Sequence, residues 1–250
     1  MKLININRLP LVLVLMLLVT MSCQLKKMSE HLSQPISKTN VTIVGAMKNV
    51  MWKGELSDRI YLDTMSNKEG LYGLGPESYL TGELLVNNGV SYLSKVISDS
   101  SMNVERRFDV SAPFFVYSNV NAWQHVKLPS NIKTIKDLEK FIDTLRADFQ
   151  NPFVFRLTGQ VKDATIHIQN LPFDTKVSSP KEAHQGQINY DITNVESEII
   201  GFFSTKHKGI FTHHDSYLHM HLITLDQRQM GHLDTLEIGN MTLYLPRNKP

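Results

Sequence analysis

Apolar and polar residues alternate over much of this chain, a pattern typical of half-buried β-strands. In the second half the alternation predicts strands at residues 153–157, 164–168, 199–204, 218–225, 231–238 and 241–245. Residues 71–92 alternate in the same way but are interrupted by glycines and Pro76, which predicts short strands joined by tight turns. We expect ordered structure to begin near residues 41–44 and a further strand at residues 113–117.

One segment has a clear helical period. Its apolar positions, three or four residues apart, are Ile135, Leu138, Phe141, Ile142, Leu145 and Phe149. Thr134 is suited to the N-cap and Asp137 to the first turn, so we predict a helix over residues 135–149. Residues 47–64 are predicted to be partly helical. Strands outnumber helices, and the fold class predicted is α+β, with two closely packed lobes built on mixed or antiparallel β-sheets and a few helices.

The first 23 residues have the pattern of an export signal. Lys2 and Arg8 precede an almost entirely apolar run at residues 9–19, which is too short to cross a membrane comfortably. The run ends at Cys23, and the segment resembles a bacterial lipoprotein signal, although Thr20 departs from the usual leucine. We therefore expect an exported lipoprotein held at the membrane by a lipid on Cys23. A plain signal peptide, or a membrane anchor with an incidental cysteine, is the alternative.

Composition narrows the classes of protein further. Residues 24–40 are polar and are predicted to be a flexible tether, so the folded domain spans residues 41–250. The chain has 42% apolar residues, which suffices for a large core, and a formal net charge of +2 without long runs of one sign. We therefore expect no nucleic-acid partner, and a homodimer is left open. Cys23 is the single cysteine, so the mature chain forms no internal disulfide.

Histidines near the end of the chain carry the strongest chemical signal. His219 and His221 are two residues apart in a predicted strand, so both side chains lie on one face. The polar residues 226–229 suit a turn, and a hairpin there would bring His232 back to the same face. Three neutral imidazoles with one position open are the layout of a catalytic zinc site. His213 and His214 are expected in a loop at the mouth of this site, and contact with the site is left open for them and for His207.

Two charged residues stand out in apolar strands. Glu83 shares a predicted strand face with Leu85, so its carboxylate either is exposed at an edge or needs a buried partner. Arg156 is the one charge in residues 153–159, where an arginine either reaches the surface or clamps a carboxylate through its planar fork. Spacing alone does not place either residue beside the histidines.

An ordered set of short motifs resembles the alpha-acetolactate decarboxylase family. The motifs are Leu-Tyr-Gly-Leu-Gly at residues 71–75, Leu-Thr-Gly-Glu-Leu at 80–84, Phe-Val-Phe-Arg-Leu-Thr-Gly at 153–159, Ile-Gly-Phe-Phe at 200–203, His-Met-His-Leu at 219–222 and Gly-His-Leu-Asp at 231–234. Each motif is weak, but the set is specific in its order and intervals. The resemblance implies a zinc ion held by His219, His221 and His232, faced by Glu83 and Arg156.

The resemblance also implies the reaction, which is loss of CO₂ from the hydroxy-keto acid 2-acetolactate to give acetoin. Zinc would act as a Lewis acid on the hydroxyl and carbonyl oxygens. Arg156 would position the carboxylate, and Glu83 would donate the proton that quenches the enediolate. Two departures from the family are visible. The loop at residues 211–218 is longer, and no acidic residue follows Glu237, where the family usually carries a glutamate.

Two other functions remain open at this stage. A cupin-like metal enzyme also uses a His-x-His pair and a later histidine, but it needs a carboxylate after the pair, and only Asp226 is available. A lipid-anchored protein that binds a metal or ligand without turnover, on a decayed decarboxylase scaffold, is the other alternative. The export signal and the short tail favour it, because acetolactate is mainly an intracellular metabolite.

Overall fold

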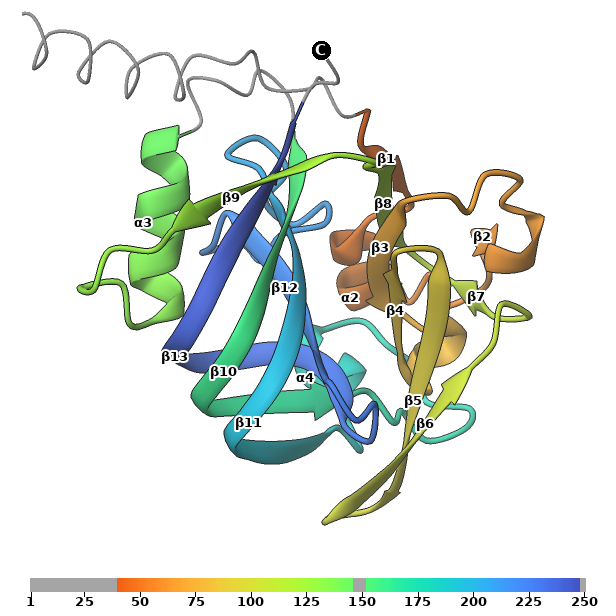
Figure 1. Ribbon diagram of the computed structural model, residues 1–250. Coiled ribbons are helices and arrows are strands. Elements are labelled where there is room, and N and C mark those ends of the chain that lie inside the picture. The colour runs from red at the N-terminus through yellow and green to blue at the C-terminus, as the bar shows by residue number, and fades with distance from the viewer. Residues whose placement is uncertain (1–39, 146–151, 248–250) are drawn as a thin grey trace, which may run out of the picture. The chain divides into compact units, whose positions relative to one another are not determined.

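Two antiparallel β-sheets face each other in the computed structural model (Figure 1). The structure describes residues 40–145 and 152–247, which belong to one unit, Ser37–Pro250. The predicted signal peptide, Cys23 and nearly all of the tether lie outside the described residues, and these predictions stay predictions. Among the described residues, no helix combines the length and apolar character needed to cross a membrane.

The first sheet is built from short segments in the first half of the chain. Its six strands, in spatial order, are β1 (Thr42–Val44), β8 (Phe115–Asn119), β3 (Leu71–Pro76), β4 (Glu83–Asn87), β5 (Val90–Ser98) and β6 (Ser101–Arg106). Strands β3 and β4 are buried because one sheet face meets the second sheet and the other covers a separate core. A small ribbon of β2 (Ile60–Tyr61) and β7 (Ser111–Ala112) lies beside the sheet.

The second sheet curls until its strands form a closed ring of neighbours. Its strands are β10 (Phe153–Ile168), β11 (Ile188–Phe203), β12 (Leu218–Thr224), β13 (Met230–Pro246) and β9 (Trp123–Lys127). Each of the strands β10 to β13 pairs with the next, and β10 also pairs with β13, which closes the ring. Strand β9 extends β13 at its far end.

Few helices accompany the sheets. They are α2 (Met47–Lys53), α3 (Ile135–Leu145) and the single turn α4 (Pro180–Ala183), with 3₁₀ turns at η1 (Leu62–Thr64) and η2 (Ser78–Leu80). Helix α3 begins as predicted: the Asp137 backbone N–H donates to the Thr134 hydroxyl (3.2 Å), and the Thr134 N–H donates to the Asp137 carboxylate (3.1 Å). Leu138 and Ile142 of α3 pack into the core enclosed by the second sheet.

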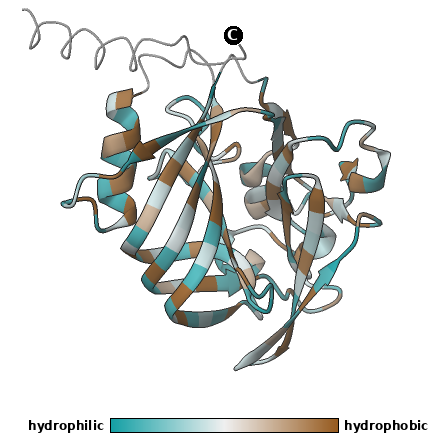
Figure 2. Cartoon of the chain, in the orientation of Figure 1, coloured by the Kyte–Doolittle hydropathy of each residue, from teal (hydrophilic) through white to brown (hydrophobic). Residues whose placement is uncertain are grey.

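Apolar and polar residues alternate along the strands of the second sheet (Figure 2). Its two faces contribute to different cores. One face packs with α3. The opposite face presents Val154, Ile200 and Phe202 to Tyr72 and Leu74 of the first sheet. The two sheets are thus held together by apolar burial, which is the predicted pair of closely packed lobes and confirms the α+β class.

Several strands are longer than the alternation indicates. The predicted strands at residues 153–157 and 164–168 are one strand, β10, and those at 231–238 and 241–245 are one strand, β13. In the polar middle of each strand the chain does not turn. There β10 and β13 stay paired with each other, with irregularities in the register. Strand β6, β9 and the first half of β11 were not predicted, because exposed polar residues obscure their period. Phe149 lies outside the described residues.

Close packing inside the second sheet generates a stability prediction. Gly201 pairs with Phe155, and a Cβ at Gly201 would lie 2.3 Å from the Phe155 ring. We expect Gly201→Ala to lower the free energy of unfolding by about 1–3 kcal/mol through overpacking. In the double variant with Phe155→Leu the smaller side chain makes room, so the loss should be less than the sum of the two single losses. Urea unfolding of the four proteins measures this coupling, and additive losses would contradict it.

Candidate active site

Strand β12 is buried on both faces, and its side chains point alternately to the two faces. Leu218, Met220 and Leu222 pack into the core that α3 covers. His219 and His221 alternate with them and face the first sheet, with exposures of 2% and 0%. The His-x-His pair therefore lies between the two sheets and not at the surface.

The predicted hairpin joins β12 to β13. Its turn is closed by the Asp226 carboxylate, which accepts hydrogen bonds from the Thr224 hydroxyl (2.7 Å) and the Arg228 N–H (3.1 Å). His221 pairs directly with His232 across the hairpin. The ring centroids of His219, His221 and His232 are 5.1–5.5 Å apart, so the structure brings the three predicted ligands into one cluster.

Glu83 approaches this cluster from the first sheet. It begins β4 and is 2% exposed, on the same strand face as Leu85, which packs against the second sheet. Its carboxylate oxygens lie 3.6 Å from Nε2 of His221 and 4.0 Å from Nε2 of His167. The buried-partner interpretation of Glu83 therefore fits its placement, and the exposed-edge interpretation does not.

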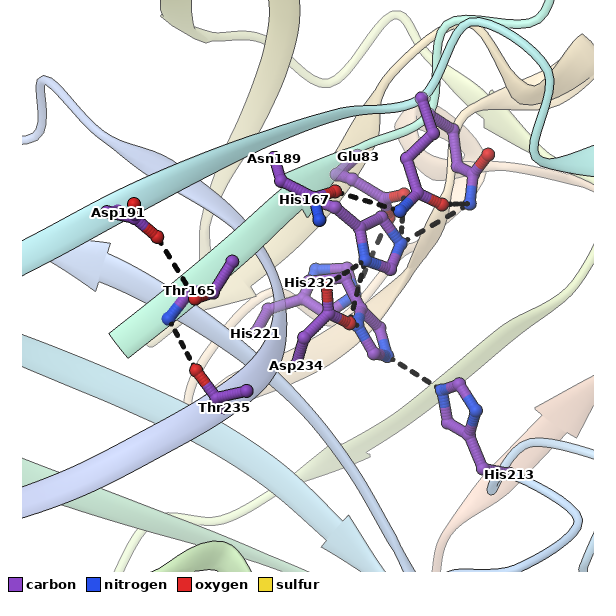
Figure 3. Close-up of polar contacts among 12 residues, drawn as sticks. Glu83, Thr165, His167, Asn189, Asp191, His213, His221, His232, Asp234 and Thr235 are labelled. Atoms are coloured by element: carbon purple, nitrogen blue, oxygen red, sulfur yellow. Dashed lines mark hydrogen bonds and ion pairs between the residues drawn. The ribbon is translucent and has the colours of Figure 1, made fainter. Parts of the chain in front are cut away.

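A second carboxylate orients the histidines from the other side (Figure 3). Asp234 accepts from Nδ1 of His167 at 2.8 Å and lies 3.1 Å from Nδ1 of His232. The rings of His167 and His232 stack with centroids 4.5 Å apart. When Nδ1 of each ring is engaged by Asp234, Nε2 of His232 remains available for another partner.

The cluster opens into a small pocket with a mostly apolar lining. One wall is apolar and comes from α2 and the first sheet, and the opposite wall is polar. The lining residues are Met47, Met51, Pro76, Leu80, Glu83, Phe114, His167, Gln169, His184, His213, His219 and His232.

Backbone strain accompanies the apolar wall. Tyr79 and Leu80 have φ angles of 61° and 54°, in the left-handed region that non-glycine residues rarely adopt. Hydrogen bonds hold them there: the Tyr79 N–H donates to the Leu56 carbonyl, and the Leu80 carbonyl accepts from the Leu171 N–H, both at 2.8 Å. The wall is thus tied to segments on both sides of the pocket.

Burial dominates the electrostatics of the site. It raises the pKa of the Glu83 carboxyl well above its usual value. It lowers the pKa of His213 and of His232 to about 4, and the neighbouring imidazoles add to both shifts. Partial burial also opposes ionisation of Asp234, but hydrogen bonds from His167 and His232 outweigh it and hold the pKa of Asp234 well below its usual value. Neutral imidazoles, two of them hydrogen-bonded to the ionised carboxylate of Asp234, suit a metal.

Unsatisfied imidazole nitrogens give an independent indication of a metal. Within the described residues, Nδ1 of His219 and both ring nitrogens of His221 make no hydrogen bond of regular geometry, although they are buried. Such groups cost free energy unless something binds them. The atoms of His167, His232 and Asp234 also lie within 4.8 Å of one another and could hold an ion. The chemistry of the donors therefore fits a metal, and within the part of the chain that the structure describes, the group whose donor atoms lie this close together is His167, His232 and Asp234.

Arg156 lies on the same sheet face as His221, because Arg156 pairs with Ile200 and Ile200 pairs with His221. It does not line the pocket described above. Its guanidinium lies over the Tyr244 ring, 4.7 Å from the centroid, and 3.9 Å from the Glu198 carboxylate. Strand spacing puts its Cα about 10 Å from that of His221. The structure thus brings Glu83 and the three histidines together and leaves Arg156 at their flank.

His213, His214 and His207, which the sequence left open, lie in three different environments. His213 lines the pocket, and its Nε2 lies 3.1 Å from Nε2 of His232. His214 is exposed. His207 stacks on Phe211 and bonds the Ser204 hydroxyl at 2.7 Å, and it is not among the lining residues.

Sequence reasoning missed four polar residues of the site, which are His167, Gln169, His184 and Asp234. Asp234 could have been found, because it follows His232 by two residues and so shares its strand face. His167 and Gln169 come from the end of β10, and His184 from the end of α4. No local signal links these elements to the hairpin, because their proximity arises from the pairing of β10 with β13.

Fold and site together define an α+β protein with a metal-suited histidine cluster between two sheets. A model of the family described as alpha-acetolactate decarboxylase matches residues 41–248. The alpha-acetolactate decarboxylase of Brevibacillus brevis is 24% identical over 212 residues, which are 82% of this chain and 70% of that protein. The chain therefore belongs to the alpha-acetolactate decarboxylase family, and this membership indicates a decarboxylase, that is, a carboxy-lyase.

Solved structures agree with the fold. The alpha-acetolactate decarboxylase of Bacillus subtilis strain 168 superposes with a TM-score of 0.67 at 20% identity, over 84% of this chain and 86% of its own. A Staphylococcus aureus protein of unknown function, similar to alpha-acetolactate decarboxylase, gives a TM-score of 0.68 at 13% identity over the same shares. At these identities the two structures support the fold alone.

The buried histidines generate a prediction about pH. In metal-free protein, His213 and His232 have pKa values of about 4 when folded, against 6.5 for the unperturbed group. Between these values the unfolded chain binds more protons, so the free energy of unfolding should fall as pH drops from about 6.5 to 4. Each group contributes up to about 1.4 kcal/mol per pH unit. Urea unfolding at several pH values, with a chelator present, measures the slope.

The two adjacent loop histidines provide the control. His213→Ala removes one buried imidazole and should make the slope shallower. His214→Ala removes an exposed imidazole and should leave the slope as it is. Equal slopes in all three proteins would show that His213 is not held neutral by burial.

Proposed function

We propose that this protein is a zinc-dependent alpha-acetolactate decarboxylase that converts 2-acetolactate to acetoin and CO₂. One observation carries the proposal: in a chain of this family, the Glu83 carboxyl is buried against the His219, His221 and His232 cluster, and Glu83, His219 and His232 line one pocket. This places a proton donor beside a metal-suited centre.

We assign the metal to His219, His221 and His232, whose ring centroids are 5.1–5.5 Å apart, and not to the other set, His167, His232 and Asp234, although the donor atoms of that set lie closer together. In the other set, His167 and Asp234 already satisfy each other through Nδ1 at 2.8 Å. His219 and His221, in contrast, have buried nitrogens without regular hydrogen bonds among the described residues. Imidazole ligands suit zinc, and bound zinc would polarise the substrate's carbonyl and hydroxyl oxygens as a Lewis acid. Asp234 would then orient His232 through Nδ1, as second-shell carboxylates do.

Glu83 would supply the proton. Loss of CO₂ breaks a carbon–carbon bond and leaves its electron pair on the substrate as an enediolate. The carboxyl proton of Glu83 goes to the carbon that carried the carboxylate, and Glu83 then regains a proton from solvent. Burial favours the protonated carboxyl in this pocket, which supports the assignment. The apolar wall formed by Met47, Met51 and Phe114 would keep bulk water away from the reacting carbon.

Arg156 would hold the leaving carboxylate before it departs, through its planar fork. Stacking on Tyr244 fixes the plane of the guanidinium, and within the described residues its Nε atom is buried without a hydrogen-bond partner. Both features support a guanidinium that is available for a ligand. The carboxylate of 2-acetolactate is attached to the carbon that carries the hydroxyl, so this role requires the guanidinium to reach from Tyr244 toward the histidine cluster.

The alternatives receive less support. A cupin-like enzyme needs a carboxylate ligand after the His-x-His pair, but the Asp226 side chain is 59% exposed and occupied in the hairpin turn. The non-catalytic alternative predicts tight metal binding without turnover. An acetoin assay on zinc-loaded protein separates it from the decarboxylase, because full zinc content with no acetoin would reject our proposal.

The role of Glu83 leads to a sharp test. Glu83→Gln should keep zinc bound but lower the rate of acetoin formation at least a hundredfold, because an amide cannot deliver the proton. Glu237→Gln is the matched control, because Glu237 is a half-exposed partner of Lys162 and does not line the pocket. Rates are compared at equal zinc content. A near-wild-type rate in Glu83→Gln would remove Glu83 from the chemistry.

Arg156 permits a test of geometry against charge. Arg156→Lys keeps the positive charge but loses the bidentate fork, so we expect a rise in KM or a fall in kcat with zinc content unchanged. Thermal unfolding of the variant is measured in parallel, because Arg156 also packs on Tyr244. Unchanged kinetics in a folded variant would make Arg156 a structural residue of β10.

A further inference from the structure

The loop between β11 and β12, residues 204–217, carries His213 into the pocket and is firmly attached. Its backbone carbonyls at Gly209 and Ile210 accept hydrogen bonds from the first residues of α2, at 2.9 and 2.7 Å. Phe211 and Thr212, which precede His213, are fully buried. The position of His213 is therefore set by the buried residues that precede it and by the hydrogen bonds of the loop to α2.

His213 points at the one ring nitrogen of His232 that Asp234 leaves available (Figure 3). The two Nε2 atoms are 3.1 Å apart. Without a metal, one imidazole must donate its N–H to the other. Two nitrogens bound at about 2.05 Å to one tetrahedral zinc ion lie about 3.3 Å apart, so a metal could replace that proton with little movement of either ring.

We propose that His213 is a fourth protein ligand of the metal held by His219, His221 and His232. This inference rests on the proposed function, because it uses the same metal, and it assigns a ligand outside the hairpin. The ring of His213 also lies 6.4 Å from that of His219, and both residues line the pocket. As a ligand, His213 would take the coordination position that the three other histidines leave open toward this pocket.

A fourth imidazole changes how the site must work. Three histidines leave a coordination position open, whereas four complete a tetrahedron. The substrate must then displace His213 or expand the coordination to five. The structure thus assigns His213 to control of access to the metal, in addition to holding it.

The test uses cobalt(II) as the spectroscopic probe in the full chain, with its neighbour His214 as the matched control. In His213→Cys, a thiolate bound to cobalt should add an intense near-ultraviolet charge-transfer band. In His214→Cys, whose side chain is exposed, no such band should appear. Absence of the band in His213→Cys at full cobalt content would overturn the proposal.

Metal affinity gives the second readout. In a zinc competition with a chelator, His213→Ala should bind zinc at least about tenfold more weakly than the wild-type chain, because one ligand is lost. His214→Ala should bind zinc with unchanged affinity. Equal affinities would also overturn the proposal.

The experiments distinguish failure of the fourth-ligand proposal from failure of the proposed function. Acetoin formation with no effect of His213 variants on metal binding rejects only the fourth ligand. The cobalt band without acetoin formation rejects only the decarboxylase, and no metal binding by the wild-type chain rejects both.

Discussion

Burial of β12 on both faces is the constraint on which the site depends. One face contributes Leu218, Met220 and Leu222 to the core under α3, and the other places His219 and His221 against the first sheet. A buried imidazole without a partner is unfavourable, so a partner for these nitrogens would make the arrangement more stable. Metal binding would therefore stabilise the fold as well as enable chemistry, because the ligands are assembled only in the folded state.

Two carboxylates face the same histidines from opposite sides, and their surroundings make them different. Glu83 comes from the first sheet and is almost fully enclosed, so its protonated form is favoured. Asp234 follows His232 on β13, and hydrogen bonds from His167 and His232 keep it ionised, with 29% of its side chain exposed. One group is suited to donate a proton and the other to orient an imidazole, a division produced by environment and not by residue type.

The pocket beside the cluster is built largely from parts of the chain outside the His-x-His motif. The strained turn at Tyr79 and Leu80 contributes to the apolar lining, and the loop at residues 204–217 brings His213 to the pocket. Both segments are held by backbone hydrogen bonds to other elements, the turn to Leu56 and Leu171 and the loop to α2. The pocket is therefore a product of the whole two-sheet assembly, and changes in sheet packing should alter its shape.

Local patterns determined much of this protein: the α+β class, the start of α3 at Thr134, and the hairpin that sets His232 opposite His221 all follow from short-range periodicity and turn chemistry. Order and spacing of motifs pointed to the family. Only the tertiary structure decided that Glu83 meets the histidines, that His167, His184 and Asp234 join them, and that Arg156 lies on Tyr244. The physical reason is that strand periodicity fixes which face a side chain takes, whereas its partner depends on which distant strands pair and how the two sheets pack.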